Sequence, residues 1–240
     1  RPNAYTSASA PVRVVPPLKN AVNENTCAIM MEPVQGEGGV IPAKKEFLEK
    51  VRKLCDEKDI LLVFDEVQTG VGRSGCLFCY QKYGVVPDIA TLAKGLAGGV
   101  PIGAMLTKDS VAAAFKPGDH ASTFGGNPLA AAAGNVVLDE IMEGGILENV
   151  ETCGKHLTEC LNKLKAKHKN IIDVRGTGLI QGIELDVPAA DVVKKSIDDG
   201  LLLVGAGVNV IRFVPSLIIT GAEIDEAMTI LDKALTEVLK

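Results

Sequence analysis

Two short runs of hydrophobic residues in the chain each end abruptly at a polar residue. Residues 60–64 are followed by the acidic pair Asp65 and Glu66, and residues 89–93 are followed by Lys94. Short, fully apolar runs are typical of buried strands in parallel sheets, whose carboxyl ends carry the chemistry of the fold. The pattern therefore predicts a carboxylate at the end of one strand and an amine at the end of another.

Helical periodicity lies between strand-like segments. A strand over residues 26–31 and a glycine-rich loop over residues 32–39 precede a predicted helix at residues 43–58. Strand, helix and strand in this order form a βαβ unit with a right-handed crossover. The predicted fold class is α/β, with a mainly parallel sheet flanked by helices. The apolar residues expected on the buried face of the helix are Phe47, Leu48, Val51, Leu54 and Cys55.

The alternation of strands and helices continues after Lys94. Residues 101–107 predict a strand, and Asp109 or Ser110 is placed to cap a short helix after it. Asn127 and Pro128 suit the N-cap and the first position of an alanine-rich helix. The later predicted elements are a helix at 147–167, strands at 171–175, 179–185, 201–204 and 210–213, a helix at 189–199, and a last helix opened by the capping box of Thr220 and Glu223.

These elements divide the chain into three parts. Residues 1–25 are a proline-rich segment without a clear period, which we leave unplaced. Residues 26–145 are predicted to form part of a large α/β unit. Residues 146–240 are predicted to form a smaller α+β unit that begins with the linking helix.

Composition narrows the choice of partners and compartment. The 240 residues are 47% hydrophobic and 23% charged, as in ordinary globular proteins, and the net charge of −5 provides no basic footprint for nucleic acid or anionic membrane. No apolar run approaches the roughly 20 residues of a membrane span, and no signal-peptide pattern opens the chain. We therefore expect a cytoplasmic protein without nucleic-acid or membrane partners.

The cysteines and histidines indicate neither a disulfide framework nor a metal centre. The six cysteines are scattered, which favours reduced thiols. Cys76 and Cys79 have the spacing of a redox motif, but a second pair and a helix-opening context are not evident. His120, His156 and His168 lack metal-ligand spacing among themselves, so we expect no metal.

Lys94 is the candidate nucleophile. It stands between Ala93 and Gly95 at a predicted strand end, in surroundings more apolar than most lysines have. A lysine in a low-dielectric site loses its proton more readily and attacks a carbonyl as a free amine. The sequence thus predicts Schiff-base chemistry at Lys94. Lys108 lies on a less apolar stretch and is not favoured for this role.

The motifs around these residues resemble those of the class III aminotransferases. The matching positions are DEVQTGVGRSG at 65–75, Pro87 and Asp88, and TLAKG at 91–95. The similarity covers the chain from about Thr26 to its C-terminus, and within the class it is strongest to the N-acetylornithine aminotransferases. The resemblance implies a fold-type I enzyme that uses pyridoxal 5′-phosphate (PLP).

The resemblance also implies which residues contact this cofactor. Lys94 would form the Schiff base and move the proton, and Asp65 would face the pyridine nitrogen, where a carboxylate keeps the ring protonated. Taken alone, Asp65 could merely cap a turn. Gln68 would lie near the phenolic oxygen, with Val67 beside it.

The loop at residues 120–128 is a second cofactor candidate. The resemblance implies that Thr123, with Ser122, reaches the cofactor phosphate from the neighbouring subunit, so that the protein is a homodimer with shared active sites. Backbone amides beside glycine at the start of a helix suit such an anion independently. The alternative for Thr123 is a residue that only begins the helix.

Arg212 and Glu37 are the substrate candidates. Arg212 is a charge inside the apolar strand at 210–213, and buried arginines are rare unless paired. A planar guanidinium holds a carboxylate through two hydrogen bonds, and the matching arginine of the family binds the substrate α-carboxylate. An internal salt bridge is the alternative. Glu32 or Glu37 would be its partner or gate, and the resemblance favours Glu37.

The implied reaction moves the δ-amino group of N-acetylornithine to 2-oxoglutarate, giving glutamate, in a ping-pong cycle of arginine biosynthesis. Ornithine and other ω-amino donors are the competing substrates. The glycine-rich phosphate cup of the family, and the aromatic residue over the pyridine ring, have no counterpart before Thr26. A catalytically incompetent chain that acts only as a dimerising module is therefore the second hypothesis.

Overall fold

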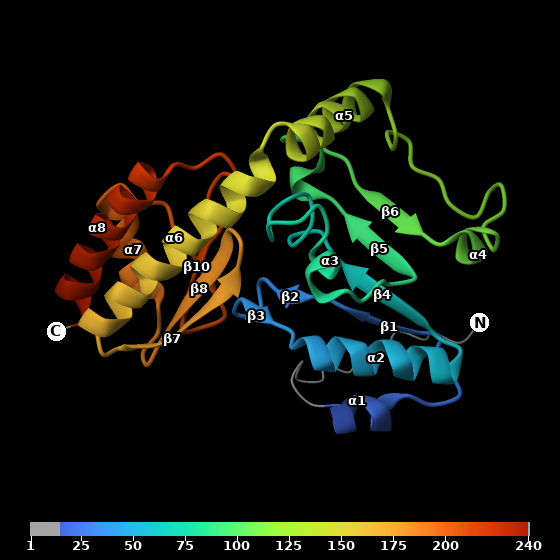
Figure 1. The fold of residues 1–240 in the computed structure, drawn as a ribbon, viewed down its shortest axis with the longest axis horizontal. Helices are drawn as coiled ribbons and strands as arrows, with labels where there is room; N and C mark the ends of the chain where they lie inside the picture. The colour runs from blue at the N-terminus through green and yellow to red at the C-terminus, as the bar shows by residue number, and fades with distance from the viewer. Residues whose placement is uncertain (1–14, 240) are drawn as a thin grey trace.

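The computed structural model describes residues 15–239, which form two four-stranded sheets that lie side by side, each with its own helices (Figure 1). The first sheet has the strand order β1-β4-β5-β6 and the second β7-β8-β10-β9. A two-stranded hairpin, β2-β3, lies between them (Figure 1). Within the described residues, no helix is both long enough and apolar enough to span a membrane.

The elements before the linking helix belong to the first sheet or surround it. In chain order they are α1 (Val15–Ala21), β1 (Ala28–Met31), β2 (Val34–Gln35), β3 (Ile41–Pro42), α2 (Lys45–Lys58), β4 (Leu61–Asp65), α3 (Cys79–Tyr83), β5 (Ile89–Leu92), the 3-10 helix η1 (Lys94–Ala97), β6 (Ala104–Thr107), α4 (Asp109–Ala112) and α5 (Pro128–Glu143).

The remaining elements surround the second sheet. They are α6 (Ile146–Lys167), β7 (Ile171–Thr177), β8 (Ile180–Leu185), α7 (Ala190–Asp198), β9 (Val204–Ala206), β10 (Val210–Phe213) and α8 (Gly221–Val238). The boundary predicted at residues 145 and 146 falls at the start of α6, which crosses diagonally from α5 to the second sheet (Figure 1).

The first sheet is mainly parallel, as the sequence predicts. Strands β1, β4 and β5 run parallel, and β6 pairs antiparallel with β5. The predicted stripe of helix α2 is confirmed, because its five apolar residues are buried against the sheet. The α/β fold class is therefore confirmed, and the carboxyl ends of β4 and β5 lie next to each other.

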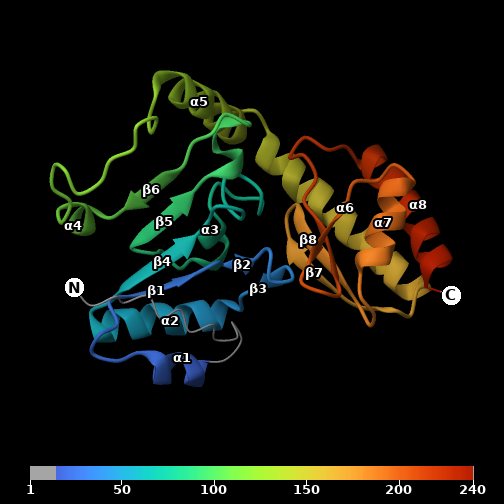
Figure 2. The ribbon, with the colours of Figure 1, turned by 180° about the vertical axis from the view of Figure 1, so that it is seen from behind.

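The second sheet is antiparallel, and its central strands β8 and β10 are buried on both faces. Helices α6, α7 and α8 cover one face, where Ile211 and Phe213 join their apolar cluster (Figure 2). Val210 joins a different cluster, formed with the hairpin and α3. Because side chains of a strand alternate between faces, Arg212 lies on the same face as Val210. Its side chain therefore faces the first unit.

Two predictions near the start of the chain need correction. The segment at 32–39 is not only a loop, because its glycines allow a hairpin in which Val34 pairs with Pro42 and Gln35 with Ile41. Part of the proline-rich segment, which the sequence left unplaced, forms helix α1. The rest of that segment before Val15 lies outside the described residues.

Two later boundaries also differ from the prediction. The N-cap of α4 is Lys108 rather than Asp109 or Ser110, because the Lys108 backbone N–H still bonds the Asp88 carbonyl beside β6. Strand β9 begins at Val204 rather than at residue 201, because the Leu201 amide bonds back to Ser196 at the end of α7. The caps at Asn127 and Thr220 are confirmed.

Three cations hold the two units together. Arg175 of β7 donates to the Gly39 and Val40 carbonyls of the hairpin. Arg73, in the loop after β4, donates to the Leu179 and Pro215 carbonyls. Burial lowers the pKa of Arg73 to about 10. The third is Lys82 of α3, which bonds the Thr177 hydroxyl and the Glu151 carboxylate.

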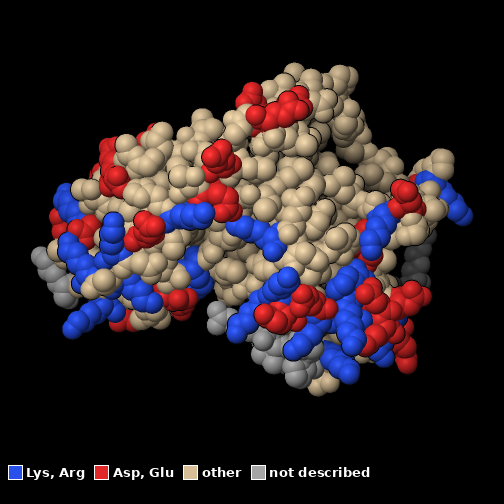
Figure 3. Space-filling view, in the orientation of Figure 1, with Lys and Arg blue, Asp and Glu red and all other residues tan. Residues whose placement is uncertain are grey.

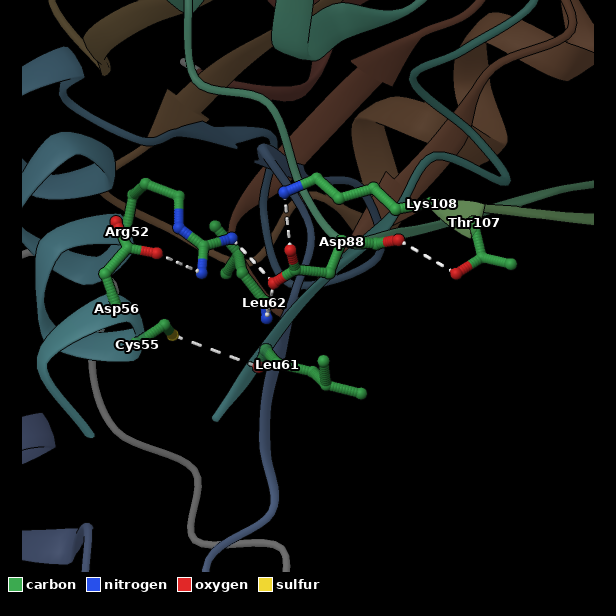
Figure 4. A network of polar contacts seen from close by, with 8 residues as sticks. All are labelled: Arg52, Cys55, Asp56, Leu61, Leu62, Asp88, Thr107 and Lys108. Carbon is green, nitrogen blue, oxygen red and sulfur yellow. Dashed lines mark hydrogen bonds and ion pairs between the residues drawn. The ribbon is translucent and has the colours of Figure 1, made fainter. Parts of the chain in front are cut away.

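Asp88, at the start of β5, is the polar centre of the first unit (Figure 4). Its carboxylate accepts from Arg52 at 2.7 Å, from Lys108 at 2.6 Å and from the Leu62 amide at 2.8 Å. Burial alone would raise the pKa of this carboxyl, but these bonds outweigh it and lower the pKa to about 2. Asp88 thus joins α2, β4, β5 and β6, and Lys108 has a structural partner here.

We predict that Asp88→Asn lowers the free energy of unfolding at pH 7 by about 3 kcal/mol, because Arg52 loses its buried charged partner. Urea titration measures the change. Asp56→Asn is the matched control, since it removes the exposed partner of the same arginine and should cost below about 1 kcal/mol. Equal losses in the two variants would contradict the role of Asp88.

Candidate active site

Asp65 is the last residue of β4, and only one of its two carboxylate oxygens accepts a hydrogen bond from the described residues. Its Oδ1 atom accepts from the Val67 amide at 2.9 Å, while Oδ2 has no hydrogen-bond partner within residues 15–239. Thr91 of β5 is its register partner, and the buried Thr91 hydroxyl also lacks a partner in the described chain. Polar atoms without partners at a strand end suit a ligand that brings its own hydrogen-bonding groups.

Lys94 follows β5 at the same edge of the sheet. Its backbone φ is +51°, in the left-handed region that costs a non-glycine residue about 1–2 kcal/mol. Such strain gathers at functional sites. Its side chain is exposed, so the expectation of low-dielectric surroundings is wrong for this chain. The reason is that the strand turns into η1 at once, and Gly95 beside it faces open space.

Arg212 extends from β10 to the first unit. The residue is 7% exposed, and its Nη1 atom donates to Glu37 Oε1 at 2.7 Å and to Gln68 Oε1 at 3.1 Å. Its buried Nε has no partner among the residues that the structure describes. The internal salt bridge that sequence analysis gave as the alternative is therefore present. The guanidinium can still donate a hydrogen bond from Nε to another acceptor.

The structure shows which of the two candidate glutamates, Glu32 or Glu37, is the partner of Arg212. Glu32 Oε2 accepts from the Gly36 amide at 2.9 Å and so closes the turn before the hairpin tip. Glu37 is the partner of Arg212, whose hydrogen bond and charge lower the pKa of Glu37, and the charge of Lys94 adds to this effect. The Glu37 side chain is 76% exposed and can leave without disrupting a core.

Gly36 leaves the space that Gln68 occupies. A Cβ atom on Gly36 would lie 2.0 Å from Gln68 Oε1. The backbone of the hairpin can therefore approach the loop after β4 only because this position lacks a side chain. Gly36, Gln68 and Arg212 thus form one contact across the two units.

Ser122 and Thr123 lie apart from this group. They occupy an exposed loop between α4 and α5, beside Pro101 and Gly103. Among the described residues, their side chains make no hydrogen bond to Asp65, Lys94 or Arg212. The structure thus brings Glu37, Gln68 and Arg212 into contact, with Lys94 near Glu37, and leaves the loop at its surface.

Glu66 and Arg73 support the site although the sequence did not single them out as site residues. Glu66 is buried and accepts from the Thr69 hydroxyl and from the Cys79 and Tyr80 amides. Burial raises its pKa despite these bonds. Glu66 thereby fixes the loop that carries Gln68, and Arg73 ties the same loop to the second unit. The signal in the sequence was their place inside the 65–75 motif.

The redox-like cysteine pair has a different context from the one expected. Cys79 does open a helix, α3, because Glu66 accepts its backbone N–H. Burial raises the pKa of the Cys79 thiol to about 12, which keeps it protonated and unreactive. None of the six cysteines, all within the described range, is in a disulfide.

Comparison with known proteins identifies the relatives of this chain. The family model described as "Aminotransferase class-III" matches residues 3–235. The match therefore begins well before Thr26, where the recognisable motifs start. An acetylornithine aminotransferase of Caldanaerobacter subterraneus subsp. tengcongensis is 54% identical over 229 residues, which is 95% of this chain and 58% of that protein.

The solved structures that this chain resembles are also aminotransferases. The N-acetylornithine aminotransferase of Stenotrophomonas maltophilia K279a is 42% identical with a TM-score of 0.81, over 89% of this chain and 57% of that one. The ornithine aminotransferase of Plasmodium yoelii is 38% identical with a TM-score of 0.86, over 92% and 60%. The chain thus spans less than two thirds of the length of these relatives.

We predict that Gly36→Ala displaces the Gln68 side chain by more than 1 Å, since its gap is 2.0 Å and ordinary contact begins at 3.4 Å. The bond from Arg212 to Gln68 should break while the fold persists, because the flexible amide can move. A crystal structure measures the displacement. Gly38→Ala is the control, because its Cβ would meet only Gln35 at 3.5 Å. An unmoved Gln68 in Gly36→Ala would refute the contact.

Proposed function

The chain belongs to the class-III aminotransferases, and from this premise we propose that it is the catalytic part of a PLP-dependent transaminase. The proposed amino donor is N-acetylornithine, which reacts at its δ-amino group, and the acceptor is 2-oxoglutarate. The observation that carries the proposal is the pair of adjoining strand ends, one with the Asp65 carboxylate and one followed by the Lys94 amine. A guanidinium that can hold a carboxylate lies in the same region.

The residues present fit PLP. Asp65 has a free carboxylate oxygen for the ring nitrogen, the Thr91 hydroxyl needs a partner, and Lys94 offers an accessible amine for the aldehyde carbon. When bound, the cofactor supplies an electron sink for the substrate carbanion. Val67 orients Asp65 through its amide, and Gln68 would bond near the phenolic oxygen. Ser122 and Thr123 would hold the phosphate group of the cofactor that is bound in the active site of the partner subunit.

Four side chains of this chain have separate roles in the proposed reaction. The Asp65 carboxylate would keep a proton on the ring nitrogen by charge attraction. Lys94 Nζ would accept the proton from the substrate carbon that bears the amino group and return it to the cofactor carbon that receives that amino group. Arg212 binds the α-carboxylate of a substrate, because its two-pronged donor set matches a carboxylate and its Nε is unused. Glu37 occupies Arg212 until the carboxylate arrives.

We further propose a homodimer with shared active sites in the cytoplasm. One observation supports the dimer. Helix α5 exposes Leu129, Val136 and Met142, and its acidic side chains lie at its C-terminal end, next to α6 (Figure 3). Exposed apolar surface of this kind suits a subunit interface. The six unpaired cysteines suit a reducing compartment.

Ornithine is the second candidate donor, because the Plasmodium yoelii ornithine aminotransferase superposes with a high TM-score. We predict that kcat/KM of this chain is at least about tenfold higher for N-acetylornithine than for ornithine. Steady-state assays with PLP and 2-oxoglutarate measure both values. A clear preference for ornithine would reassign the substrate. Folded protein that is inactive with both amines would favour the dimerising module.

We predict that Arg212→Gln lowers kcat/KM for 2-oxoglutarate by about 30- to 1,000-fold, the equivalent of about 2–4 kcal/mol for a lost charge-assisted pair. The loss should appear mainly in KM, since the group binds and does not transfer protons. Arg212→Lys should recover part of it. Glu32→Gln is the control, because Glu32 contacts the turn and not Arg212. An unchanged KM in Arg212→Gln would contradict the role.

A further inference from the structure

Three side chains of types that bind metals converge between helices α6 and α8. His156 and Cys160 are one turn apart on α6, and Asp225 comes from α8. His156 Nε2 lies 2.7 Å from Asp225 Oδ1, and Cys160 Sγ lies 3.8 Å from each of these two atoms. The proposed transaminase chemistry does not use this cluster, and an ion pair between His156 and Asp225 does not require the Cys160 thiol beside it.

The arrangement does not match a nucleophilic triad. In such a triad one ring nitrogen of the histidine faces the nucleophile and the other faces the carboxylate. Here the same Nε2 atom faces both the thiol and the carboxylate. One donor atom from each residue thus lies within 4.8 Å of the other two, as the ligands of a single cation would.

The spacing suits a tetrahedral zinc ion. With Zn–N and Zn–O near 2.0–2.1 Å and Zn–S near 2.3 Å, the donor atoms lie about 3.3–3.6 Å apart. The two sulfur distances of 3.8 Å are close to this range. Only the distance from His156 to Asp225 must widen, by about 0.6 Å. The Asp225 side chain, which is 63% exposed, is free to make that adjustment.

The charges also favour a divalent cation. The Cys160 residue is 8% exposed, and the Asp225 carboxylate lies beside its sulfur. A bound cation displaces the thiol proton, and the resulting thiolate and carboxylate together neutralise a charge of +2. Imidazole, thiolate and carboxylate form a borderline-soft donor set, which selects Zn²⁺ over Mg²⁺ or Ca²⁺.

We propose that His156, Cys160 and Asp225 bind one Zn²⁺ ion, with water as the fourth ligand, and that this ion clamps α6 to α8. The absence of metal-ligand spacing among the histidines concealed the site from sequence analysis, because Asp225 lies 69 positions after His156 and the thiol comes from Cys160. The site would stabilise the second unit and is independent of the PLP chemistry.

The same two helices contain a matched pair that lacks the thiol. His168 Nε2 lies 2.6 Å from Asp232 Oδ1, and Lys167 occupies the other oxygen of Asp232. A cation at this pair would meet the Lys167 ammonium and no sulfur. His168→Gln is therefore the control for the loss of a histidine between α6 and α8.

The test adds Co²⁺ and then Zn²⁺ to the chelator-treated full chain. We expect one equivalent of Co²⁺ to produce a thiolate-to-cobalt charge-transfer band in the near ultraviolet, and Zn²⁺ to abolish that band by displacement. Zinc at 100 times its Kd should raise the Tm by about 5–10 °C. Cys160→Ser should remove the band, and Asp225→Asn, which alters an exposed side chain and keeps the fold, should weaken binding at least tenfold.

Three controls keep the experiment decisive. His168→Gln, Cys153→Ser on the same helix, and Cys27→Ser at an exposed thiol should all retain the band and the zinc shift. Circular dichroism without metal establishes that each variant is folded. A band that survives in Cys160→Ser, or a chain that gives neither band nor shift, overturns the proposal.

Discussion

The ion pair between Arg212 and Glu37 joins the two units of the chain at the point where the candidate site lies. Arg212 is buried on the second sheet, and its only carboxylate partner among the described residues comes from the hairpin of the first unit. A buried guanidinium without such a partner is costly. The two units must therefore meet so that Glu37 and Gln68 approach β10, which also sets where Arg212 stands relative to Asp65 and Lys94.

Further contacts hold the two units together around the Arg212–Glu37 ion pair. Arg175, Arg73 and Lys82 bind backbone carbonyls or side chains across the boundary. One apolar cluster also contains residues of both units: Val34 and Val40 of the first, and Ile180 and Val210 of the second. Glu37 differs from these residues because its side chain is exposed. A buried cation paired with an exposed carboxylate is the combination that the proposed exchange of Glu37 for a substrate carboxylate requires.

The sequence predicted most elements because local signals agreed with the fold. Helix α2 and the ends of β4 and β5 followed from periodicity, and the caps at Asn127 and Thr220 from residue type. The sequence prediction failed where long-range contacts decide. Lys108 takes the N-cap position of α4 because its backbone N–H bonds the Asp88 carbonyl, and Lys94 is exposed because no described segment covers it. The partner of Arg212 and the cluster of His156, Cys160 and Asp225 also depend on residues distant in sequence, which no local pattern encodes.

We infer that this chain presents one amine, Lys94, to an aldehyde cofactor beside Asp65. The most direct test adds PLP to the purified chain, reduces it with borohydride and locates the labelled lysine by peptide mass. The account predicts about one label per chain on Lys94, with little on Lys108, which is occupied by Asp88. Label spread over surface lysines, or no label, would contradict the claim.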